Sequence, residues 1–197
     1  MLQNYESKNE PVKLYKPGSS EKKNLLNEYY KMSNEIVEIP IIIGGKEFKT
    51  GNTNTCVMPH DHQHILANYH MAGNDEIDIA INNSLETWKT WSKTPLEKRT
   101  KIFRNAAELL QGKWRDRINA ATMLNQSKNV FQAEIDSACE LIDFFNFNAE
   151  YAEKINHNQP LISPEGVHNY LEYRPLEGFV FAITPFNFTS IAGNLPS

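Results

Sequence analysis

Residues 178–197, GFVFAITPFNFTSIAGNLPS, contain an unbroken apolar run from Phe179 to Ile183, bounded by Gly178 and Pro185. A strand that is buried on both faces of a parallel sheet has this pattern. In open α/β sheets, ligands bind just beyond the carboxyl ends of such strands. The stretch therefore predicts an α/β fold, and Asn187, which follows the predicted strand, is the first candidate site residue.

Upstream of this stretch, the segment EIPIIIGGKEFKT, residues 38–50, predicts a β-hairpin. Two glycines, Gly44 and Gly45, stand between apolar runs, and they can supply the positive φ angles of a type I′ turn. Residues 51–72 are rich in Asn, Thr and His and favour one or two further strands.

Helical patterns fill most of the remaining chain. Residues 22–35 predict a polar helix, and a second helix begins at Asn74, which we expect to cap it. Thr94 is expected to cap the next helix, with Pro95 at its first position. A further helix is expected over 114–125. A long one begins near Val130 and is expected to bury one side, which consists of Ile135, Ala138, Cys139, Ile142, Phe145 and Ala149.

Charge and composition exclude several classes of protein. The chain has 197 residues and a net charge of -4, which argues against a nucleic-acid partner, because binding to phosphates needs clustered Lys and Arg. No apolar run reaches the roughly 20 residues that span a bilayer, so no membrane partner is predicted. The first 23 residues have neither an apolar signal core nor an Arg-rich amphipathic helix, which favours the cytoplasm.

Three histidines and two cysteines are candidates for metal or thiol chemistry. His60, His62 and His64 alternate along the chain, but no fourth ligand stands at a conventional spacing, so the prediction is solvated imidazoles and no metal. Cys56 and Cys139 are far apart and lack a C-x-x-C spacing. Buried or inert thiols are the favoured interpretation of both.

Acidic residues recur along the long helix at Glu134, Asp136, Glu140 and Asp143, of which Asp136, Glu140 and Asp143 share a face. A row of this kind is usually the solvated face of a helix. Glu140, however, has apolar neighbours on both sides, so a carboxylate that lies in a pocket is the second interpretation.

Asn187 also has two interpretations. Asn is common in turns, where its side chain bonds to nearby backbone. At the tip of a buried strand and between two phenylalanines, a fixed carboxamide N–H could instead donate to a developing oxyanion, a contact typically worth about 3 to 4 kcal/mol in the transition state.

Two blocks of sequence resemble a known family. SKNVFQAEIDSACELIDFFNFNAEYAE, residues 127–153, and YRPLEGFVFAITPFNFTSIAGNLPS, residues 173–197, are similar to the amino-terminal part of the Δ1-pyrroline-5-carboxylate dehydrogenases, also called L-glutamate γ-semialdehyde dehydrogenases. These enzymes belong to the aldehyde dehydrogenase superfamily. The resemblance covers nearly the whole chain, from KNEPVKLYKPGS, residues 8–19, to the end.

The resemblance implies an enzyme that uses NAD to oxidise L-glutamate γ-semialdehyde, formed from 1-pyrroline-5-carboxylate, to L-glutamate in proline catabolism. Asn187 would be the oxyanion donor. The cofactor-binding residues would be Thr184, Ile183 and Phe186. Glu140 and Phe188 would bind the aldehyde substrate, with Glu140 near its amino end.

The resemblance also implies how the chain is organised. The amino-terminal arm and first helix would occupy 1–36, and the hairpin and helices of an NAD-binding domain would occupy 37–165. An oligomerisation strand would occupy 166–176, so the complete enzyme would be at least a dimer. The first Rossmann-like strand and the substrate and cofactor loop would occupy 177–197, which leaves an incomplete fold.

The resemblance further implies that the family's nucleophilic cysteine and base glutamate lie outside these residues. The chain is therefore expected to be a fragment that is inactive by itself. If the source is eukaryotic, the resemblance implies the mitochondrial matrix rather than the cytoplasm. A different hypothesis is a non-catalytic module that binds a protein partner through the amphipathic helices of residues 75–154.

Overall fold

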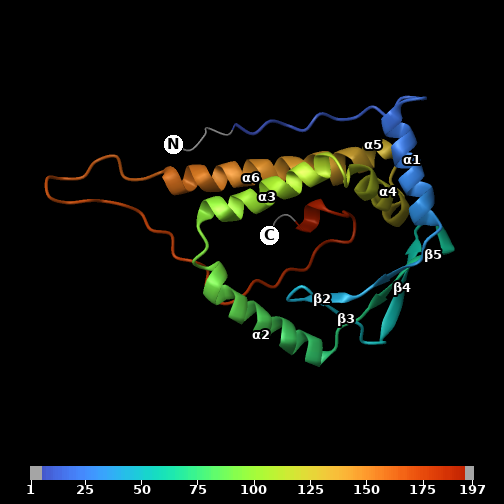
Figure 1. The fold of residues 1–197 in the computed structure, drawn as a ribbon, viewed down its shortest axis with the longest axis horizontal. Helices are drawn as coiled ribbons and strands as arrows, with labels where there is room; N and C mark the ends of the chain where they lie inside the picture. The colour runs from blue at the N-terminus through green and yellow to red at the C-terminus, as the bar shows by residue number, and fades with distance from the viewer. Residues whose placement is uncertain (1–5, 194–197) are drawn as a thin grey trace.

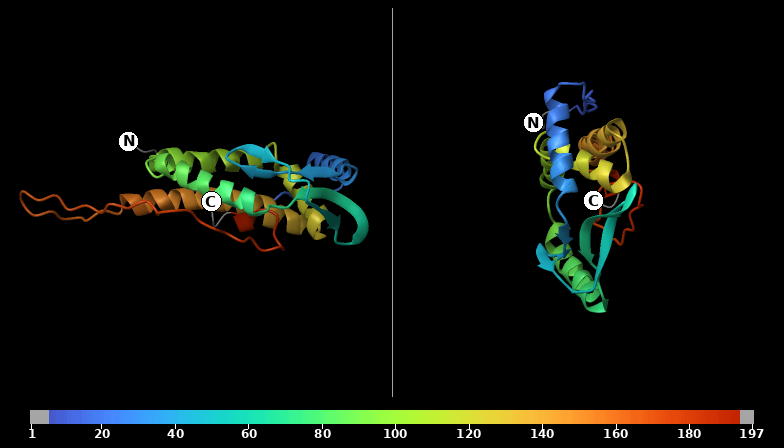
Figure 2. Two further views of the ribbon diagram at one scale, coloured as in Figure 1. Left: turned by 90° about the horizontal axis from the view of Figure 1, so that it is seen from below. Right: turned by 90° about the vertical axis from the view of Figure 1, so that its right-hand side faces the viewer.

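The structure, a computed structural model, describes residues 6–193 (Figure 1). Its elements follow in the order α1 Ser20–Ser33, β1 Val37–Ile39, β2 Ile41–Ile43, β3 Lys46–Phe48, β4 Thr53–Met58, β5 Asp61–His70, α2 Asn74–Trp91, α3 Leu96–Gln111, α4 Arg115–Gln126, α5 Val130–Ala133, the π-helical segment η1 Glu134–Cys139, α6 Glu140–His157 and the 3₁₀ turn η2 Ile191–Gly193. Helices α3 and α6 lie side by side, and the strands and α2 lie apart from them (Figures 1 and 2). Within residues 6–193, no helix combines the length and the apolar character needed to cross a bilayer.

The predicted hairpin is confirmed as β2 and β3, which pair antiparallel with Ile41 opposite Phe48. Gly44 and Gly45 have φ angles of 57° and 75°, which only glycine adopts at low cost. A Cβ atom at Gly44 would also lie 2.7 Å from Nδ2 of Asn83. The further strands expected over 51–72 are β4 and β5, and with β1 they form a three-stranded sheet in the order β1-β5-β4.

The helical part is held by contacts between elements far apart in the sequence. Helix α3 packs on α6, where the rings of Phe103 and Phe145 lie 5.7 Å apart, and α1 packs on α4. A core cluster of Tyr15, Leu25 and Ala120 joins the amino-terminal arm, α1 and α4. The predicted helices are confirmed, with starts at most two residues from those expected.

Two of the predicted caps are corrected. The N-cap of α2 is Gly73, whose N–H donates to the Glu76 carboxylate over 2.8 Å, and Asn74 is the first helical residue. The N-cap of α3 is Pro95, and the Thr94 hydroxyl donates to the Thr90 carbonyl of the preceding helix instead. Thr94 thus stands one residue before the N-cap position, and no side chain caps α3.

The long helix predicted from Val130 is interrupted by the π-helical turn η1. A π turn inserts one extra residue, which rotates the face that follows it. Glu134 is therefore fully buried, whereas Ile135, which we expected on the buried side, is 42% exposed. Glu134 lies off the face that Asp136, Glu140 and Asp143 share, and its burial was not predicted, whereas the predicted burial of Ala138, Cys139, Ile142 and Ala149 is confirmed.

Glu134 forms the centre of a buried polar network. Its carboxylate accepts hydrogen bonds from Nη2 of Arg115 (2.5 Å), the N–H of Lys13 (2.8 Å), the hydroxyl of Tyr15 (2.7 Å) and the amide of Asn119 (2.8 Å). Burial raises the pKa of Glu134, but these hydrogen bonds outweigh that effect and hold its pKa below the ordinary value. The network ties η1, α4 and the amino-terminal arm together.

The rest of the amino-terminal arm lies along α6 (Figure 1). It is held there by hydrogen bonds to carboxylates of that helix. Asp143 accepts from the N–H of Glu10 (2.6 Å) and the amide of Asn9 (2.7 Å), and Glu150 accepts from the N–H of Ser7 (2.6 Å). Carboxylates that accept backbone N–H groups form strong hydrogen bonds, so the extended arm is a fixed part of the structure.

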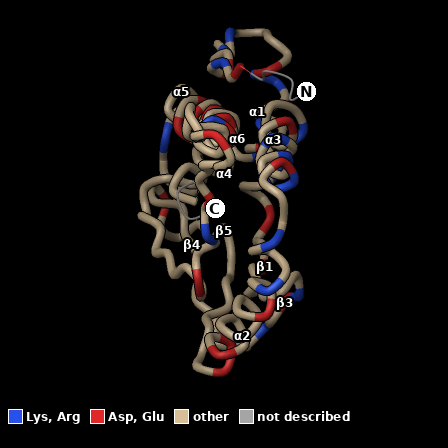
Figure 3. The backbone as a smooth tube through the Cα atoms, turned by 90° about the vertical axis from the view of Figure 1, so that its left-hand side faces the viewer, with Lys and Arg blue, Asp and Glu red and all other residues tan. Residues whose placement is uncertain are grey.

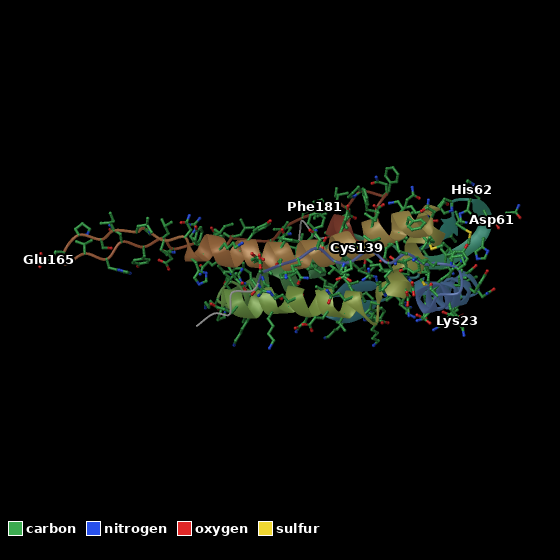
Figure 4. All side chains as sticks on the ribbon, turned by 90° about the horizontal axis from the view of Figure 1, so that it is seen from above. Lys23, Asp61, His62, Cys139, Glu165 and Phe181 are labelled. Atoms are coloured by element: carbon green, nitrogen blue, oxygen red, sulfur yellow. The ribbon has the colours of Figure 1, made fainter. Side chains whose placement is uncertain are left out.

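After α6 the chain runs out in a long protrusion and returns, with Glu165 at its far end (Figures 1 and 4). Strands were expected at 166–176 and at 179–183. Neither segment forms a strand, and neither pairs with another described segment. The reason is that strand propensity acts only through a neighbouring strand that supplies hydrogen-bond partners.

The apolar side chains of 179–183 are consequently exposed, with Phe181 at 80% and Ile183 at 82%. We predict that the 197-residue chain self-associates through them, because exposed apolar extended segments are templates for association. Changing both Phe181→Asp and Ile183→Asp should shift the chain toward monomer in sedimentation-velocity experiments. The control is the pair Asn24→Asp and Asn27→Asp on α1, which adds equal charge. Equal dissociation of the two double variants would contradict the prediction.

Candidate functional site

The loop that carries Asn187 lies against the helices where α4 ends and η1 begins. On one side of the loop, Thr189 bonds to Thr122 of α4, with 2.8 Å between the hydroxyl oxygens. The Thr122 hydroxyl also bonds to Ser137 of η1 (2.5 Å), and the Ser190 hydroxyl donates to the Ser137 carbonyl (2.9 Å). π-Helical turns occur frequently at functional sites, and here the turn is a point of attachment for the loop.

The predicted site residues of the loop differ in their surroundings. Asn187 is exposed, and its main-chain carbonyl accepts a hydrogen bond from Nζ of Lys128 (2.8 Å). The Phe188 ring is half-buried, with the same ammonium group 4.3 Å from its centroid. Lys128 thus holds the two residues through the Asn187 main-chain carbonyl and the Phe188 ring. The Asn187 carboxamide takes no part in these contacts and lies on the exposed side of the loop.

The three residues predicted to bind a cofactor precede Asn187 on the same exposed segment. Thr184 is exposed, and the side chains of Ile183 and Phe186 are 82% and 96% exposed. Together they present apolar surface and one hydroxyl next to the Asn187 loop.

Glu140 follows the π-helical turn directly and is half-buried. It lines an open groove of about 370 Å³ together with Asn9, Asp143, Phe144, Phe147, Asn148 and Tyr151. Burial, and next the nearby carboxylates of Asp136 and Asp143, raise its pKa above the ordinary value. A carboxylate in a groove agrees with the second of the two interpretations of Glu140. Its negative charge would attract a cationic group into the groove.

The raised pKa of Glu140 predicts the effect of pH on stability. Because the folded chain binds this proton more tightly than the unfolded chain, the group stabilises the fold below about pH 4, and that stability is lost as pH rises through the raised pKa. We therefore expect Glu140→Gln to be more stable than the unchanged chain at pH 7 and about equally stable near pH 4, as measured by urea unfolding.

The control for this prediction is Glu165→Gln at the tip of the protrusion, which should change stability at neither pH. A Glu140→Gln variant that is less stable than the unchanged chain at pH 7 would contradict the assignment.

Neither cysteine has the surroundings of a nucleophile. Cys139 is buried near the middle of the helices, and burial together with the nearby Glu134 raises its pKa to about 12 (Figure 4). Its thiol is therefore protonated at neutral pH. Cys56 is half-buried and its Sγ lies 2.9 Å from Oδ1 of Asn125. The prediction that Cys139 is a buried thiol is confirmed.

The three histidines do not converge on a common point. Nδ1 of His60 bonds to the Ser127 hydroxyl (2.7 Å), and Nε2 of His64 bonds to the Ser33 carbonyl (2.7 Å). In the described range 6–193, no group of three or more His, Cys, Asp or Glu side chains has the arrangement of a metal site.

Sequence reasoning missed the residues that hold the loop, Lys128 and Thr122, and it missed Arg115 and its burial with Glu134. No local pattern marks these contacts. The partners in them, Ser137, Asn187, Thr189 and Glu134, lie between 15 and 67 residues away in the chain.

Residues 47–193 match the model of the aldehyde dehydrogenase family. The chain belongs to this family. Among curated aldehyde dehydrogenases, it is 46% identical to a probable delta-1-pyrroline-5-carboxylate dehydrogenase of Schizosaccharomyces pombe over 95% of the chain and 34% of that protein. It is 43% identical to the mitochondrial delta-1-pyrroline-5-carboxylate dehydrogenase of Dictyostelium discoideum, over 96% of the chain and 34% of that protein.

A solved structure of an aldehyde dehydrogenase confirms the fold. The structure of the delta-pyrroline-5-carboxylate dehydrogenase of Mycobacterium tuberculosis bound with NAD superposes with a TM-score of 0.95 at 44% identity. The match covers the whole of this chain and 37% of the solved chain. The chain thus spans about a third of the length of the curated relatives it matches, and its helices and strands correspond to part of the aldehyde dehydrogenase fold.

Proposed function

We propose that the protein carrying this chain oxidises L-glutamate γ-semialdehyde, formed from 1-pyrroline-5-carboxylate, to L-glutamate with NAD. The observation that carries the proposal is a likeness of 44% identity and a TM-score of 0.95 along the whole chain to a solved enzyme of that name bound with NAD. The loop of Asn187 and Phe188, attached at the π-helical turn beside Glu140, would supply an oxyanion donor and part of the substrate pocket for such a reaction.

Asn187 serves as the oxyanion donor in this proposal. As the aldehyde oxygen gains negative charge, the carboxamide N–H donates to it, and a donor that is already in place needs no reorganisation in the transition state. Exposure of Asn187 and attachment of the loop through its main chain both support this role. Phe188 then packs against the carbon chain of the substrate, and Glu140 attracts its ammonium group.

Ile183, Thr184 and Phe186 are proposed to contact NAD. Their exposed side chains offer apolar area and one hydroxyl, which fits a flat ring that carries one polar substituent. When bound there, NAD supplies the hydride acceptor. These residues orient the ring, and Phe186, at 96% exposure, can exclude water from its edge.

The test is an assay of NADH absorbance with the polypeptide encoded by the complete reading frame, given 1-pyrroline-5-carboxylate and NAD. NADH formation that depends on both compounds is expected. The 197 residues by themselves should form none, because Cys139 is buried with a raised pKa and the Cys56 thiol is hydrogen-bonded to Asn125. Absence of NADH above the substrate-free control with the complete polypeptide would overturn the proposal.

We also propose that the protein works as a homo-oligomer, at least a dimer. The protrusion after α6 extends away from the helices (Figure 2). Its exposed apolar side chains include Val167, Tyr170, Leu171 and Tyr173. Contiguous exposed apolar area on an extended segment is typical of a surface that a partner covers.

Two further proposals concern partners and compartment. Basic and acidic residues are intermingled along the chain, and the net charge of -4 agrees with a small-molecule substrate and no nucleic-acid partner (Figure 3). For a eukaryotic source the mitochondrial matrix is the proposed compartment, since the Dictyostelium relative is described as mitochondrial. For a bacterial source the cytoplasm is proposed.

A further inference from the structure

We propose that Gln126 and Lys128 form a clamp on the main chain of residues 187–189, and that this clamp positions the Asn187 carboxamide and the Phe188 ring. The two side chains are positioning residues and do not themselves touch the reacting atoms. Their effect on the loop stands on the structure alone, whereas its consequence for catalysis rests on the proposed function.

Lys128 makes three contacts with one ammonium group. Nζ donates to Oδ2 of Asp136 (2.7 Å) and to the carbonyl of Asn187 (2.8 Å), and it lies 4.3 Å from the centroid of the Phe188 ring. The side chains of Lys128 and Asp136 are only 18% and 24% exposed, so water screens the pair less than it screens a surface pair. Asp136 belongs to η1, and Lys128 therefore ties the loop to the π-helical turn.

Gln126 holds the next two peptide groups. With its amide turned so that the oxygen faces donors, the oxygen accepts from the N–H of Phe188 (3.2 Å) and of Thr189 (2.9 Å), and the nitrogen donates to the carbonyl of Asn187 (3.1 Å). The Asn187 carbonyl has two lone pairs and can accept from Gln126 and Lys128 together.

Ser127, between the two clamp residues, has an unusual backbone. Its φ and ψ angles of 53° and 32° are left-handed, a conformation that costs a non-glycine residue energy. This turn ends α4 and directs the side chains before and after it toward the same loop. Strained positions of this kind persist where the surroundings fix them and are concentrated at functional sites.

The contacts of the clamp explain why the loop is fixed while its functional side chain remains exposed. The contacts that Gln126 and Lys128 make with the loop go to its main-chain atoms or to the Phe188 ring. The Phe186 ring is 96% exposed, so packing cannot fix the chain before Asn187. A loop held by its peptide groups can present a carboxamide in one direction without burying it.

The test is hydrogen–deuterium exchange of the amides of residues 186–190, measured on dilute chain. Gln126→Leu and Lys128→Met should each speed exchange at Phe188 and Thr189 about tenfold, because each removes hydrogen bonds that keep the loop closed. Amides within α6 should not change, which separates local opening from loss of the fold. Lys89→Met, which removes only an exposed pair with Glu86, is the control.

Conservative changes sharpen the result. Gln126→Glu keeps the acceptor for both N–H groups and Lys128→Arg keeps the charge, so both should retain more protection than the apolar variants. Unchanged exchange at Phe188 and Thr189 in both apolar variants, or an equal effect of Lys89→Met, would overturn the clamp.

The catalytic consequence is measured separately in the complete polypeptide. Lys128→Met should lower kcat about tenfold while the KM for NAD changes little, and Lys128→Arg should restore part of kcat. Faster exchange without any activity of the unchanged enzyme would leave the clamp in place and remove the proposed function. Activity of the unchanged enzyme, together with unaltered exchange and unaltered kcat in the Lys128→Met variant, would keep the proposed function and remove the clamp.

Discussion

Asn187→Ala in the complete polypeptide is expected to lower kcat for 1-pyrroline-5-carboxylate by about 100- to 1,000-fold, the usual loss when one oxyanion donor is removed. The physical reason is that the carboxamide is needed mainly when negative charge develops on the aldehyde oxygen. The KM should therefore change far less than kcat. Steady-state NADH formation at saturating NAD measures both constants.

The matched control is Asn156→Ala in the last turn of α6. Asn156 is exposed, and its main-chain carbonyl, which alanine retains, accepts a hydrogen bond from the Gln159 amide. This variant should keep the kcat of the unchanged enzyme. If Asn187→Ala keeps a kcat within about twofold of that of the control, Asn187 is not an oxyanion donor.

Breaking the buried ion pair should have the largest effect on stability. We expect Arg115→Met to lower the free energy of unfolding by about 3 to 5 kcal/mol, because it leaves the Glu134 carboxylate without its cation at a fully buried position. That is a large share of the roughly 5–15 kcal/mol available to a domain. Urea unfolding followed by tryptophan fluorescence measures the change.

A double-mutant cycle separates the pair from its surroundings. Glu134→Leu alone should also destabilise the fold but by less, since the Arg115 guanidinium keeps its ion pair with Glu10. The double variant should lose less than the sum of the two single changes. The surface pair of Lys89 and Glu86 is the control, for which about 0–1 kcal/mol is expected. Strict additivity of Arg115→Met and Glu134→Leu would contradict a coupled buried pair.

The parts of the fold that depend on local pattern could be predicted from the sequence. The hairpin followed from Gly44-Gly45 between apolar runs, and the helices followed from the spacing of apolar residues. The family resemblance, carried by residues 127–153 and 173–197, predicted the fold class that the comparisons confirm.

The parts that depend on distant residues could not be predicted in the same way. One extra residue in η1 changed which acidic side chain is buried, and nothing in the sequence around Glu134 marks that insertion. The apolar pattern at 179–183 is that of a strand, but a strand also needs a neighbour, and the described residues supply none.

The candidate site shows the same division. Asn187 and Glu140 could be singled out from their neighbours in the sequence, whereas Gln126 and Lys128 became visible only when the loop was seen against the end of α4. Their roles depend on the proximity of segments about 60 residues apart.

The most direct measurement is the position of the Asn187 carboxamide in a crystal structure of the complete polypeptide with an aldehyde substrate bound. The account predicts that Nδ2 of Asn187 lies about 2.7–3.1 Å from the oxygen derived from the aldehyde, the distance expected of an oxyanion donor. A carboxamide that points away from the bound aldehyde, with that oxygen held by other groups, would contradict it.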